Sequence, residues 1–341
     1  MDMIPQDIID AYDFGTIKSV KPISVGLIHQ TYQILAKNGT FIAQRLHPVL
    51  ASAAIGKDFF VVTKNLKVLA KDKEGRMWRV QTFLPGATFT AVRDAKMARE
   101  AGAMFGRFHK TLAGLKYDFK SKKILHETDK IFAAFVKVVK KNWKNPLLDD
   151  VAEDVAFLAN EMHKVLLPAS LPLRAIHGDP KISNLLFDDK GRASGIVDLD
   201  TCNRRPLLVE TGDMFRSWCG MQEDDAKNVF RLDIFKAGWK GYLASVSPPH
   251  REEGSGVVAS KGFLTARERK LVPKSVATIT LELASRFLAD YFEDNYFGWD
   301  DSRYPSRRAH NLARARGQLA LYRDIQKKMI KMEAIVNSQG L

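Results

Sequence analysis

The stretch AIHGDPKISNLLF, residues 175–187, and the run GIVDLD, residues 195–200, decide how this chain folds and what chemistry it can carry. Four side chains with carboxylate or amide oxygens lie in and around these two apolar runs: Asp179, Asn184, Asp198 and Asp200. Phosphoryl transfer needs such a set. One acid orients the attacking hydroxyl and accepts its proton, while an amide and further carboxylates hold the magnesium ions that neutralise the phosphate oxygens. The stretch therefore predicts a phosphoryl-transfer site.

The two runs also have the pattern of a β-hairpin. Residues 185–187 are apolar, residues 188–192 are turn residues that include Gly191, and residues 193–199 form a second strand. A tight hairpin would bring Asp198 beside Asn184, so that both could bind one cation. Asp and Asn are also common in turns, where they are usually solvated. The joint spacing outweighs that alternative, because Asp179 and Asn184 are separated as in a protein-kinase catalytic loop.

Length and composition indicate a globular protein with two lobes. The chain has 341 residues, of which 45% are apolar and 27% charged. No uncharged apolar run is long enough to span a membrane, and the N-terminus lacks the blocks of a secretion signal. The two cysteines, Cys202 and Cys219, have no metal-binding spacing. These features favour a cytoplasmic protein that is not associated with a membrane.

The net charge of +14 raises the question of a polyanionic partner. The basic residues are dispersed, and their densest groups, at residues 120–123, 137–144, 303–316 and 327–331, do not alternate with aromatic residues. A solvated surface accounts for most of this charge, so nucleic acid is an unfavoured partner. A basic cleft would also suit ATP.

The first 86 residues predict a small lobe of strands with one main helix. After a short amphipathic helix in residues 1–13, strand patterns cover residues 20–23, 31–35 and 41–46, with a hairpin at Asn38-Gly39. Gly26 lies in the position of a phosphate-covering loop, but with a single glycine the stretch fits a plain hairpin at least as well. Gln44 and Arg45 must face opposite sides of the third strand. Arg45 could contact the α- and β-phosphates, or it could be an exposed edge residue.

A helix over residues 51–70 and a strand over residues 77–84 complete this lobe. The strand ends at Pro85-Gly86, which suits a hinge where backbone groups meet an adenine, and Gln81 and Phe83 are the candidate nucleotide contacts. We therefore place the lobe boundary at 86/87. The N-terminal lobe, residues 1–86, would cover ATP, and the C-terminal lobe, residues 87–341, would hold the catalytic hairpin 175–200 and the acceptor-binding helices.

The C-terminal lobe has mostly helical periodicity. Helices are predicted over residues 93–115, 130–144, 150–165, 229–243, 276–292 and 309–332, with another beginning at Glu210. Residues 245–273 are rich in Pro, Gly, Ser and charge, which predicts a long mobile loop. Asp213 could cap its helix or brace the catalytic loop. His109 is expected to be a structural histidine.

With these residues in place, the chain resembles the aminoglycoside phosphotransferase and choline kinase superfamily. The resemblance rests on His177-Gly178-Asp179 with Asn184, on residues 196–200, and on Gly212-Asp213. Within the superfamily it is most similar to the N-acetylhexosamine 1-kinase branch, through residues 26–32, 41–46, 78–83, 281–291 and 310–318. Together these stretches extend over nearly the whole chain.

The resemblance implies an α+β, protein-kinase-like bilobal fold, with a small N-terminal β-sheet lobe and a larger, mostly helical C-terminal lobe. It implies a kinase that uses ATP and Mg²⁺, with Asp179 as the base and Asn184 and Asp198 as magnesium ligands. The same resemblance makes Asp200 a second metal or substrate carboxylate and Asp213 the brace of the loop. His29, Arg314 and Arg316 would face a sugar. The chain lacks the multi-glycine loop and the third-strand lysine of protein kinases.

The expected acceptor is a small hydroxylated molecule, a sugar or amino sugar of the N-acetylhexosamine kind. Aminoglycoside, choline or homoserine are alternatives. Aminoglycosides are disfavoured by the arginines of residues 303–316, and choline would need an aromatic cage, for which residues 291–299 supply rings. In a different class, the chain could be a nucleotide-binding protein without turnover or a basic nucleic-acid-binding protein. The patterns specify no oligomeric state.

Overall fold

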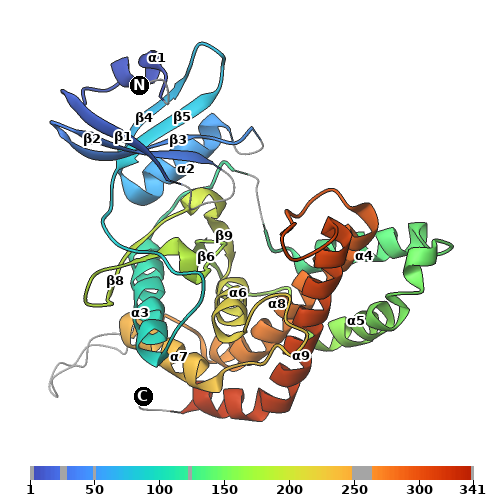
Figure 1. Cartoon of the computed structure of the whole chain (residues 1–341). Helices are drawn as coiled ribbons and strands as arrows, with labels where there is room; N and C mark the ends of the chain where they lie inside the picture. The colour runs from blue at the N-terminus through green and yellow to red at the C-terminus, as the bar shows by residue number, and fades with distance from the viewer. Residues whose placement is uncertain (1–3, 24–28, 49–50, 122–124, 248–262, 339–341) are drawn as a thin grey trace, which may run out of the picture. The chain divides into compact units, whose positions relative to one another are not determined.

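The computed structural model describes residues 4–23, 29–48, 51–121, 125–247 and 263–338. The chain divides into two compact units: Met1–Gly86 with Leu115–Lys123 and Val197–Asn203, and Ala87–Gly114 with Ile124–Ile196 and Arg204–Leu341. The first unit contains a small antiparallel sheet and the second is mostly helical (Figure 1). The predicted fold class is confirmed. Two later segments, residues 115–123 and 197–203, group with the N-terminal sheet, whereas the sequence analysis assigned them to the C-terminal lobe.

The sheet of the first unit has five strands in the order β1-β2-β3-β5-β4. Their bounds are β1 Ile17–Ile23, β2 Gln30–Ala36, β3 Gly39–Arg45, β4 Leu66–Lys71 and β5 Met77–Thr82. The predicted hairpin at Asn38-Gly39 joins β2 to β3, where Ala36 pairs with Gly39 at a φ of 139°. Only glycine adopts that backbone conformation without strain, so the turn fixes the register of both strands.

The two faces of this sheet carry different helices. Helix α1, Gln6–Asp10, places Ile8 in an apolar cluster with Trp78 and Val80 of β5. Helix α2, Ala53–Thr63, lies on the other face, where Gly56 meets Leu69 and the Phe59 ring lies under the Arg79 guanidinium. Because side chains alternate along a strand, even- and odd-numbered residues of β5 serve different faces.

The predicted helix over residues 51–70 was too long. The helix ends at Thr63, where Lys64 adopts a left-handed conformation with φ 56°, and strand β4 follows after one more residue. The apolar spacing of residues 59–69 also fits a strand in its second half. Pairing decides between the two, because Val68 is buried opposite Val80 in the sheet.

The buried carboxylate of Asp58 on α2 attaches the segment 115–121 to the first unit. It accepts hydrogen bonds from the Tyr117 hydroxyl (2.8 Å) and from the backbone amides of Lys120 and Ser121 (2.8 and 2.6 Å). A buried carboxylate is tolerated only with such donors. Burial and the neighbouring carboxylate raise the pKa of Tyr117 to about 12.

The second unit is built from seven helices and four short strands within the described residues. The helices are α3 Ala95–Leu112, α4 Thr128–Lys141, α5 Ala152–Val165, α6 Leu207–Cys219, α7 Leu232–Val246, α8 Ala266–Glu293 and α9 Arg307–Asn337. The strands are β6 Leu173–Ile176 with β9 Asn203–Pro206, and β7 Leu185–Phe187 with β8 Ala193–Ile196.

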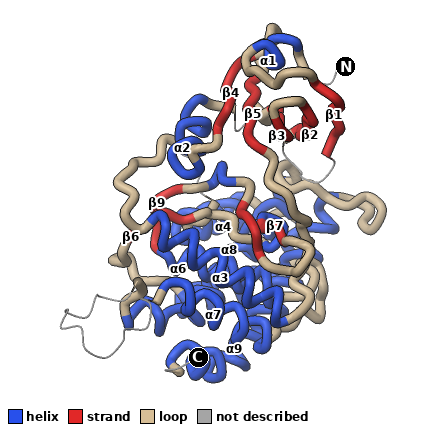
Figure 2. Tube along the Cα trace, turned by 90° about the vertical axis from the view of Figure 1, so that its left-hand side faces the viewer, coloured by secondary structure: helices blue, strands red, loops and turns tan. Residues whose placement is uncertain are grey.

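Glycines let these helices approach very closely. Helices α3 and α7 lie side by side in both ribbon views (Figures 1 and 2), and a Cβ added at Gly102 would lie 2.0 Å from the carbonyl oxygen of Gly238. A Cβ at Gly212 of α6 would lie 2.6 Å from the carbonyl oxygen of Ser275 on α8. Larger residues would push these pairs apart.

The predicted loop over residues 245–273 is corrected at both ends. Helix α7 extends to Val246, and α8 begins at Ala266, with a capping box in which Thr265 and Glu268 bond reciprocally. Pro273 therefore lies inside a helix, not in a loop. Residues 248–262 lie outside the described part of the chain.

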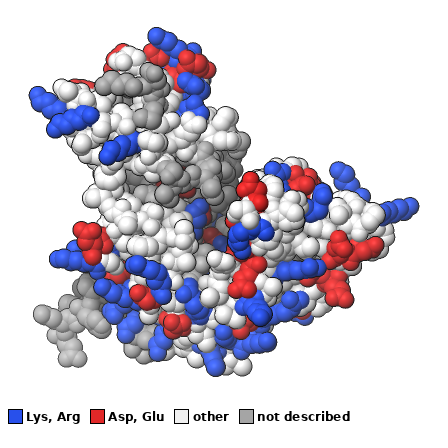
Figure 3. Space-filling model, in the orientation of Figure 1, with Lys and Arg blue, Asp and Glu red and all other residues white. Residues whose placement is uncertain are grey.

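The surface supports the prediction of dispersed charge. On the face drawn in Figure 3, Lys and Arg side chains are interspersed with Asp and Glu and do not form one continuous patch. Among the described helices, none combines the length and the apolar character that crossing a bilayer requires.

Candidate active site

The predicted catalytic loop lies in the second unit and closes on itself. Strand β6 leads into His177, and Gly178 adopts a φ of 86° that turns the chain. The side-chain Nδ2 of Asn184 donates to the main-chain oxygen of Asp179 (2.8 Å), and the Asp179 amide donates to His177 Nδ1 (3.2 Å). The Asp-to-Asn spacing thus forms a ring, which orients the amide oxygen of Asn184 away from the loop backbone.

The carboxylate of Asp179 stays accessible in this loop. Its Oδ2 lies 2.7 Å from Lys181 Nζ, and the two side chains are 20% and 45% exposed. An ion pair this exposed contributes little to stability. The acid can therefore exchange its partner for an incoming hydroxyl at low cost.

Glu210 of α6 braces the loop, a role that the sequence analysis gave to Asp213. Its buried carboxylate accepts the backbone amides of His177 (2.9 Å) and Gly178 (2.8 Å), and also His109 Nε2 (3.0 Å). His109 in turn contacts the Tyr242 hydroxyl at 2.9 Å, so it is a structural histidine as expected. Burial alone would raise the pKa of Glu210, but the hydrogen bonds and nearby histidines hold it below its usual value. Glu210 is therefore an ionised anchor.

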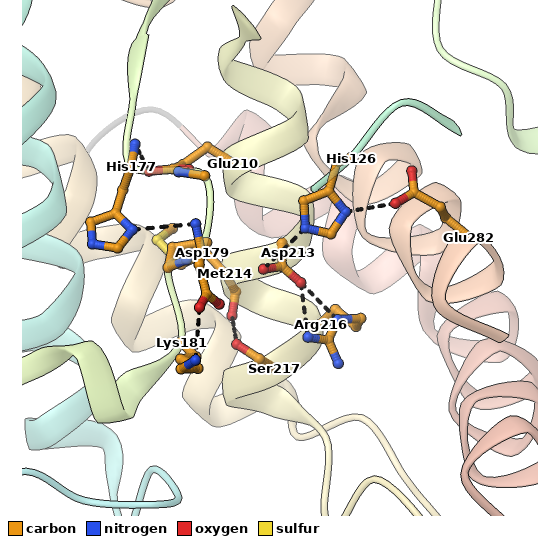
Figure 4. A network of polar contacts seen from close by, with 12 residues as sticks. His126, His177, Asp179, Lys181, Glu210, Asp213, Met214, Arg216, Ser217 and Glu282 are labelled. Carbon is orange, nitrogen blue, oxygen red and sulfur yellow. Dashed lines mark hydrogen bonds and ion pairs between the residues drawn. The ribbon is translucent and has the colours of Figure 1, made fainter. Parts of the chain in front are cut away.

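Asp213 belongs to a row of buried charges beside the loop (Figure 4). Helix α6 begins at Leu207 rather than Glu210, so Asp213 lies inside the helix and does not cap it. Its carboxylate binds the Arg216 guanidinium (2.9 and 2.8 Å) and faces His126 Nε2 (3.5 Å), while His126 Nδ1 meets Glu282 of α8 (2.6 Å).

Opposite charges alternate along this row, and each stabilises the ionised form of its neighbour. Burial lowers the pKa of His126, but the carboxylates of Glu282 and Asp213 outweigh it and raise the pKa to about 10. Burial likewise disfavours charge on Asp213, yet Arg216 and His126 hold its pKa well below the usual range. His126 is thus an imidazolium near neutral pH. Nothing in its local sequence marks it as charged.

The hairpin after the loop forms as predicted, but its second strand is shorter than predicted: β8 ends at Ile196, and residues Leu199–Thr201 form a 3-10 turn instead of strand. Leu185 pairs with Ile196 and Phe187 with Ala193, across a turn closed by Asp188. The chain then enters the segment Val197–Asn203, which belongs to the first unit. Within it Asp198 has a left-handed backbone, with φ 61° and ψ 56°. Such strain in a non-glycine residue costs on the order of 1–3 kcal/mol and is concentrated at functional sites. A cation shared by Asn184 and Asp198 stays a prediction.

Asp200 has partners that the sequence analysis did not foresee. Both its oxygens are bound by the guanidinium of Arg79, and Oδ2 also lies 2.8 Å from His29 Nε2. The backbone amide of His47 donates to His29 Nδ1 (3.1 Å), which places the ring proton on Nε2. Burial would raise the pKa of Asp200, but the Arg79 charge and the His29 hydrogen bond lower it well below its usual range. The His29 side chain is 6% exposed and is bonded to Asp200, and its contact with a sugar stays a prediction.

Arg45, the predicted phosphate contact, lies on the opposite face of the sheet from Arg79, and its contact with phosphate stays a prediction. Arg45 pairs with Trp78, whereas Gln44 pairs with Arg79, and directly paired residues share a face. Gln44 is therefore the β3 residue on the same face as Arg79 and helix α2, and it accepts a hydrogen bond from Arg79 Nε (2.8 Å). The pairing thus decides which face each of the two residues occupies, which the sequence left open.

The remaining predicted nucleotide contacts have mixed outcomes. The Phe83 amide donates to the Thr40 carbonyl (2.9 Å), so it is already used within the sheet. Gln81 Oε1 is buried and has no hydrogen-bond partner among the described residues, which leaves an acceptor for a ligand donor. Gly26 lies outside the described residues.

Arg314 and Arg316, both predicted to face a sugar, point to different neighbours. Arg314 donates to the Gly298 carbonyl (2.7 Å) and approaches Glu223 (3.6 Å), while Arg316 binds Asp154 of α5 (2.9 Å) and the Asp150 carbonyl (2.8 Å). The two do not converge on one site, because residues two apart on a helix lie on nearly opposite sides.

The donor set suits a hard cation. Amide and carboxylate oxygens such as those of Asn184 and Asp198 favour magnesium, calcium or manganese over zinc. No group of three or more His, Cys, Asp and Glu side chains forms a metal site within the part of the chain that the structure describes.

Two homoserine kinases are similar to this chain over most of its length. Homoserine kinase of Zymomonas mobilis is 24% identical over 271 residues, which cover 74% of this chain and 81% of that protein. Homoserine kinase of Gluconobacter oxydans is 24% identical over 254 residues, covering 67% and 75%. Both matches include most of the relative's length.

Solved structures with the same fold cover almost the whole chain. The aminoglycoside phosphotransferase of Alicyclobacillus acidocaldarius has a TM-score of 0.61 at 11% identity, covering 97% of this chain and 98% of that one. A choline/ethanolamine kinase family protein of Mesorhizobium loti has a TM-score of 0.54 at 18% identity, covering 93% and 92%. At these identities the likeness shows the fold alone.

Residues 19–242 match the model of the phosphotransferase enzyme family, APH. This match covers most of the chain and includes the catalytic loop, the hairpin and α6. The predicted superfamily and the predicted class of enzyme are confirmed, while the N-acetylhexosamine branch stays a prediction. The chain belongs to the phosphotransferase enzyme family.

Proposed function

We propose that this protein transfers the γ-phosphate of ATP, with Mg²⁺, to a hydroxyl of a small molecule in the cytoplasm. The observation that carries the proposal is the closed Asp179–Asn184 loop, whose backbone is held by the buried Glu210 while the Asp179 carboxylate stays accessible. A rigid loop with one accessible acid is what a positioned general base requires.

The chain's own residues have distinct tasks in this reaction. Asp179 orients the acceptor hydroxyl and takes its proton, and Lys181 neutralises the acid until the acceptor arrives. Asn184 and Asp198 would hold magnesium, which supplies positive charge to the phosphate oxygens. Gln81, with its unpaired oxygen, is a candidate acceptor for the adenine amino group. Most of the rate gain would come from positioning and charge, not from proton transfer.

We propose a sugar or amino sugar as the acceptor. The support comes from the end of α8, where Asp290 accepts the backbone amides of Asn295, Tyr296 and Phe297 (2.8–2.9 Å) and the side chain of Asn311 (2.8 Å). This network builds a loop in which Tyr296 is 64% exposed. An exposed ring on a rigid loop suits the apolar face of a sugar.

Paired charges lead from this loop toward Asp179. Arg314 binds the Gly298 carbonyl and approaches Glu223, which approaches Arg216 (3.7 Å). Burial would lower the pKa of Arg216, but the carboxylates of Asp213, Glu223 and, to a smaller extent, Asp179 raise it above its ordinary value. Because these charged side chains are already paired with one another, the surface favours an acceptor that presents hydroxyl groups over one that carries a net charge. A choline cage is disfavoured, because Tyr291 and Phe292 are buried in the core.

Homoserine is the second candidate, because the homoserine kinases above are similar over most of their length. The two acceptors differ in a testable way: homoserine is a small zwitterion, and a hexosamine is a ring with several hydroxyls.

The test is a screen of ADP release with ATP and Mg²⁺ against N-acetylhexosamines, simple sugars, L-homoserine, aminoglycosides and choline. Asp179→Ala serves as the blank and should be at least roughly a hundredfold slower with the true acceptor. A homoserine signal without a sugar signal would replace the first acceptor by the second. Equal rates for wild type and Asp179→Ala would contradict the assigned base.

Steep salt-dependent oligonucleotide binding, unaffected by ATP, would instead indicate that the protein binds nucleic acid.

A further inference from the structure

The contacts of Asp200 conflict with a role as metal ligand. Its carboxylate is 1% exposed and receives both terminal nitrogens of Arg79 and the Nε2 proton of His29. With the guanidinium on both oxygens and His29 on Oδ2, three of the roughly four lone-pair sites of this carboxylate are already occupied. To coordinate a cation, Asp200 would have to leave one of the strongest buried ion pairs in the first unit.

Hydrogen bonds and an aromatic ring also hold the Arg79 side chain in place. Its Nε donates to Gln44 Oε1 (2.8 Å), Gln44 Nε2 donates to the Thr31 hydroxyl (3.1 Å), and the guanidinium lies 4.7 Å from the centre of the Phe59 ring. These partners come from β2, β3 and α2. Each of its three guanidinium nitrogens thus donates a hydrogen bond, and the arginine is held rigidly against the sheet.

By binding Asp200, Arg79 holds the segment Val197–Asn203, which also contains Asp198. The segment makes a single 3-10 turn, Leu199–Thr201, in which the Cys202 amide donates to the Leu199 carbonyl (3.1 Å). A strained left-handed residue persists only where its surroundings determine the backbone on both sides. Asp200, two residues after Asp198, supplies that constraint on one side through Arg79 and His29.

We propose that Arg79 and His29 are positioning residues for magnesium, which hold Asp198 in its metal-binding conformation by anchoring Asp200 to the sheet, and that Asp200 is not itself a ligand. The inference rests on the proposed function, because it takes Asp198 as a ligand. Removing a group that orients a metal ligand typically weakens metal affinity 10- to 100-fold.

The two roles of Asp200 predict opposite effects of an Arg79 substitution. If Asp200 is an anchor, Arg79→Lys weakens metal binding, because a lysine cannot form the fork that aligns the carboxylate. If Asp200 is a ligand restrained by Arg79, the same change frees an oxygen donor and strengthens metal binding. The sign of the change thus separates the two.

The experiment measures Mn²⁺ binding by water-proton relaxation, in the presence of a non-hydrolysable ATP analogue, so that it does not depend on the acceptor. We expect a rise in the Mn²⁺ dissociation constant of about 10-fold or more for Arg79→Lys and a smaller rise for His29→Gln. An unchanged or lower constant in Arg79→Lys overturns the inference. If Arg79→Lys does not fold, His29→Gln decides alone, and an unchanged or lower constant in it has the same consequence.

Two further variants make the result specific. Arg76→Lys is the matched control, since Arg76 also pairs with a buried acid of this sheet, Asp72, but lies at the β4–β5 turn. It should bind Mn²⁺ as wild type does, and an equal loss in this control would overturn the inference by showing a general effect of the sheet. Asp198→Asn tests the proposed function separately. If it binds Mn²⁺ normally, the metal assignment is wrong. If it loses Mn²⁺ while Arg79→Lys gains affinity, only the present inference fails.

Discussion

Replacing Glu210 by Gln is the most direct test of how the catalytic loop is held. Oε1 of this carboxylate accepts the His177 amide and His109 Nε2, and Oε2 accepts the Gly178 amide, all within 2.8–3.0 Å. A glutamine has one oxygen and one NH₂ group. It can keep the two donors at the first position, but its NH₂ group then faces the Gly178 amide, donor against donor.

The cost follows from counting these three hydrogen bonds. The hydrogen bonds from the His177 amide and His109 survive, but each loses about 1 kcal/mol because its acceptor is no longer ionised. The Gly178 amide is left buried without an acceptor, which costs about 1–3 kcal/mol. Burying a neutral amide in place of a charge returns part of this loss. The lowered pKa of Glu210 shows that its surroundings favour the ionised form, so the balance stays unfavourable. We expect a loss of about 2–4 kcal/mol in the free energy of unfolding.

Activity should fall as well, because a loop displaced by about 1 Å can cost about 100-fold in rate. The assay combines urea unfolding with ADP release at a temperature well below the unfolding transition. Trp218 is a suitable fluorescence reporter, because its Nε1 donates to the Pro180 carbonyl of the loop (2.9 Å). Glu293→Gln, an exposed acid at the end of α8, is the control and should behave as wild type. The reasoning is refuted if Glu210→Gln unfolds within about 0.5 kcal/mol of wild type and keeps its kcat within twofold.

Two other variants test the buried charges and the predicted sugar contact of Arg316. His126 has a pKa of about 10 in the folded protein and an ordinary value of 6.5, so its stabilising charge is fully present below about pH 6.5 and is lost as pH rises toward 10. Urea unfolding from pH 6 to 10 should show this loss in wild type but not in His126→Gln, and parallel curves would contradict it. Arg316 is 48% exposed and joins α9 to α5. Arg316→Gln should change stability by less than about 1 kcal/mol and leave the KM for the acceptor unchanged, whereas a several-fold rise in KM would restore its predicted contact with substrate.

The sequence predicted the features that depend on local spacing. Five positions separate Asp179 from Asn184, and this alone defines the ring that the loop forms. The β7–β8 hairpin follows equally from a short apolar run, a turn and a second run. One local signal was overlooked. Thr265 and Glu268 form a capping-box pattern, which marks the start of α8 inside the region predicted as a loop.

The features that failed depend on contacts between distant residues. Glu210 and Asp213 are two acids three positions apart, and only the path of β6 decides which of them reaches the loop amides. Gln44 and Arg45 differ only in the phase of a strand, which is set by pairing with β5. Asp58 is a buried anchor only because residues about sixty positions later donate hydrogen bonds to its carboxylate. Propensity and periodicity carry no information about such pairings.

Gly212 and Asp213 are adjacent in sequence, and the first allows the close helix packing on which the second depends. Because Gly212 has no side chain, α8 can lie against α6 with the Ser275 carbonyl where a Cβ would stand, 2.6 Å away. Two helical turns beyond Ser275, the same helix carries Glu282, which together with Asp213 keeps His126 charged. Gly212→Ala should therefore do more than destabilise the helix pair by about 1–3 kcal/mol.

By moving α8 away, Gly212→Ala should also weaken the pH dependence of stability that His126 confers. Urea unfolding at pH 6 and pH 10 measures both effects, and we expect the difference between the two pH values to shrink relative to wild type. Gly114→Ala is the control, because a Cβ there meets no atom within 4 Å. If Gly212→Ala loses stability equally at both pH values, the glycine serves helix packing alone and the charge row is independent of it. A smaller loss at pH 10 than at pH 6 is expected only if the close approach of α8 is what keeps His126 ionised.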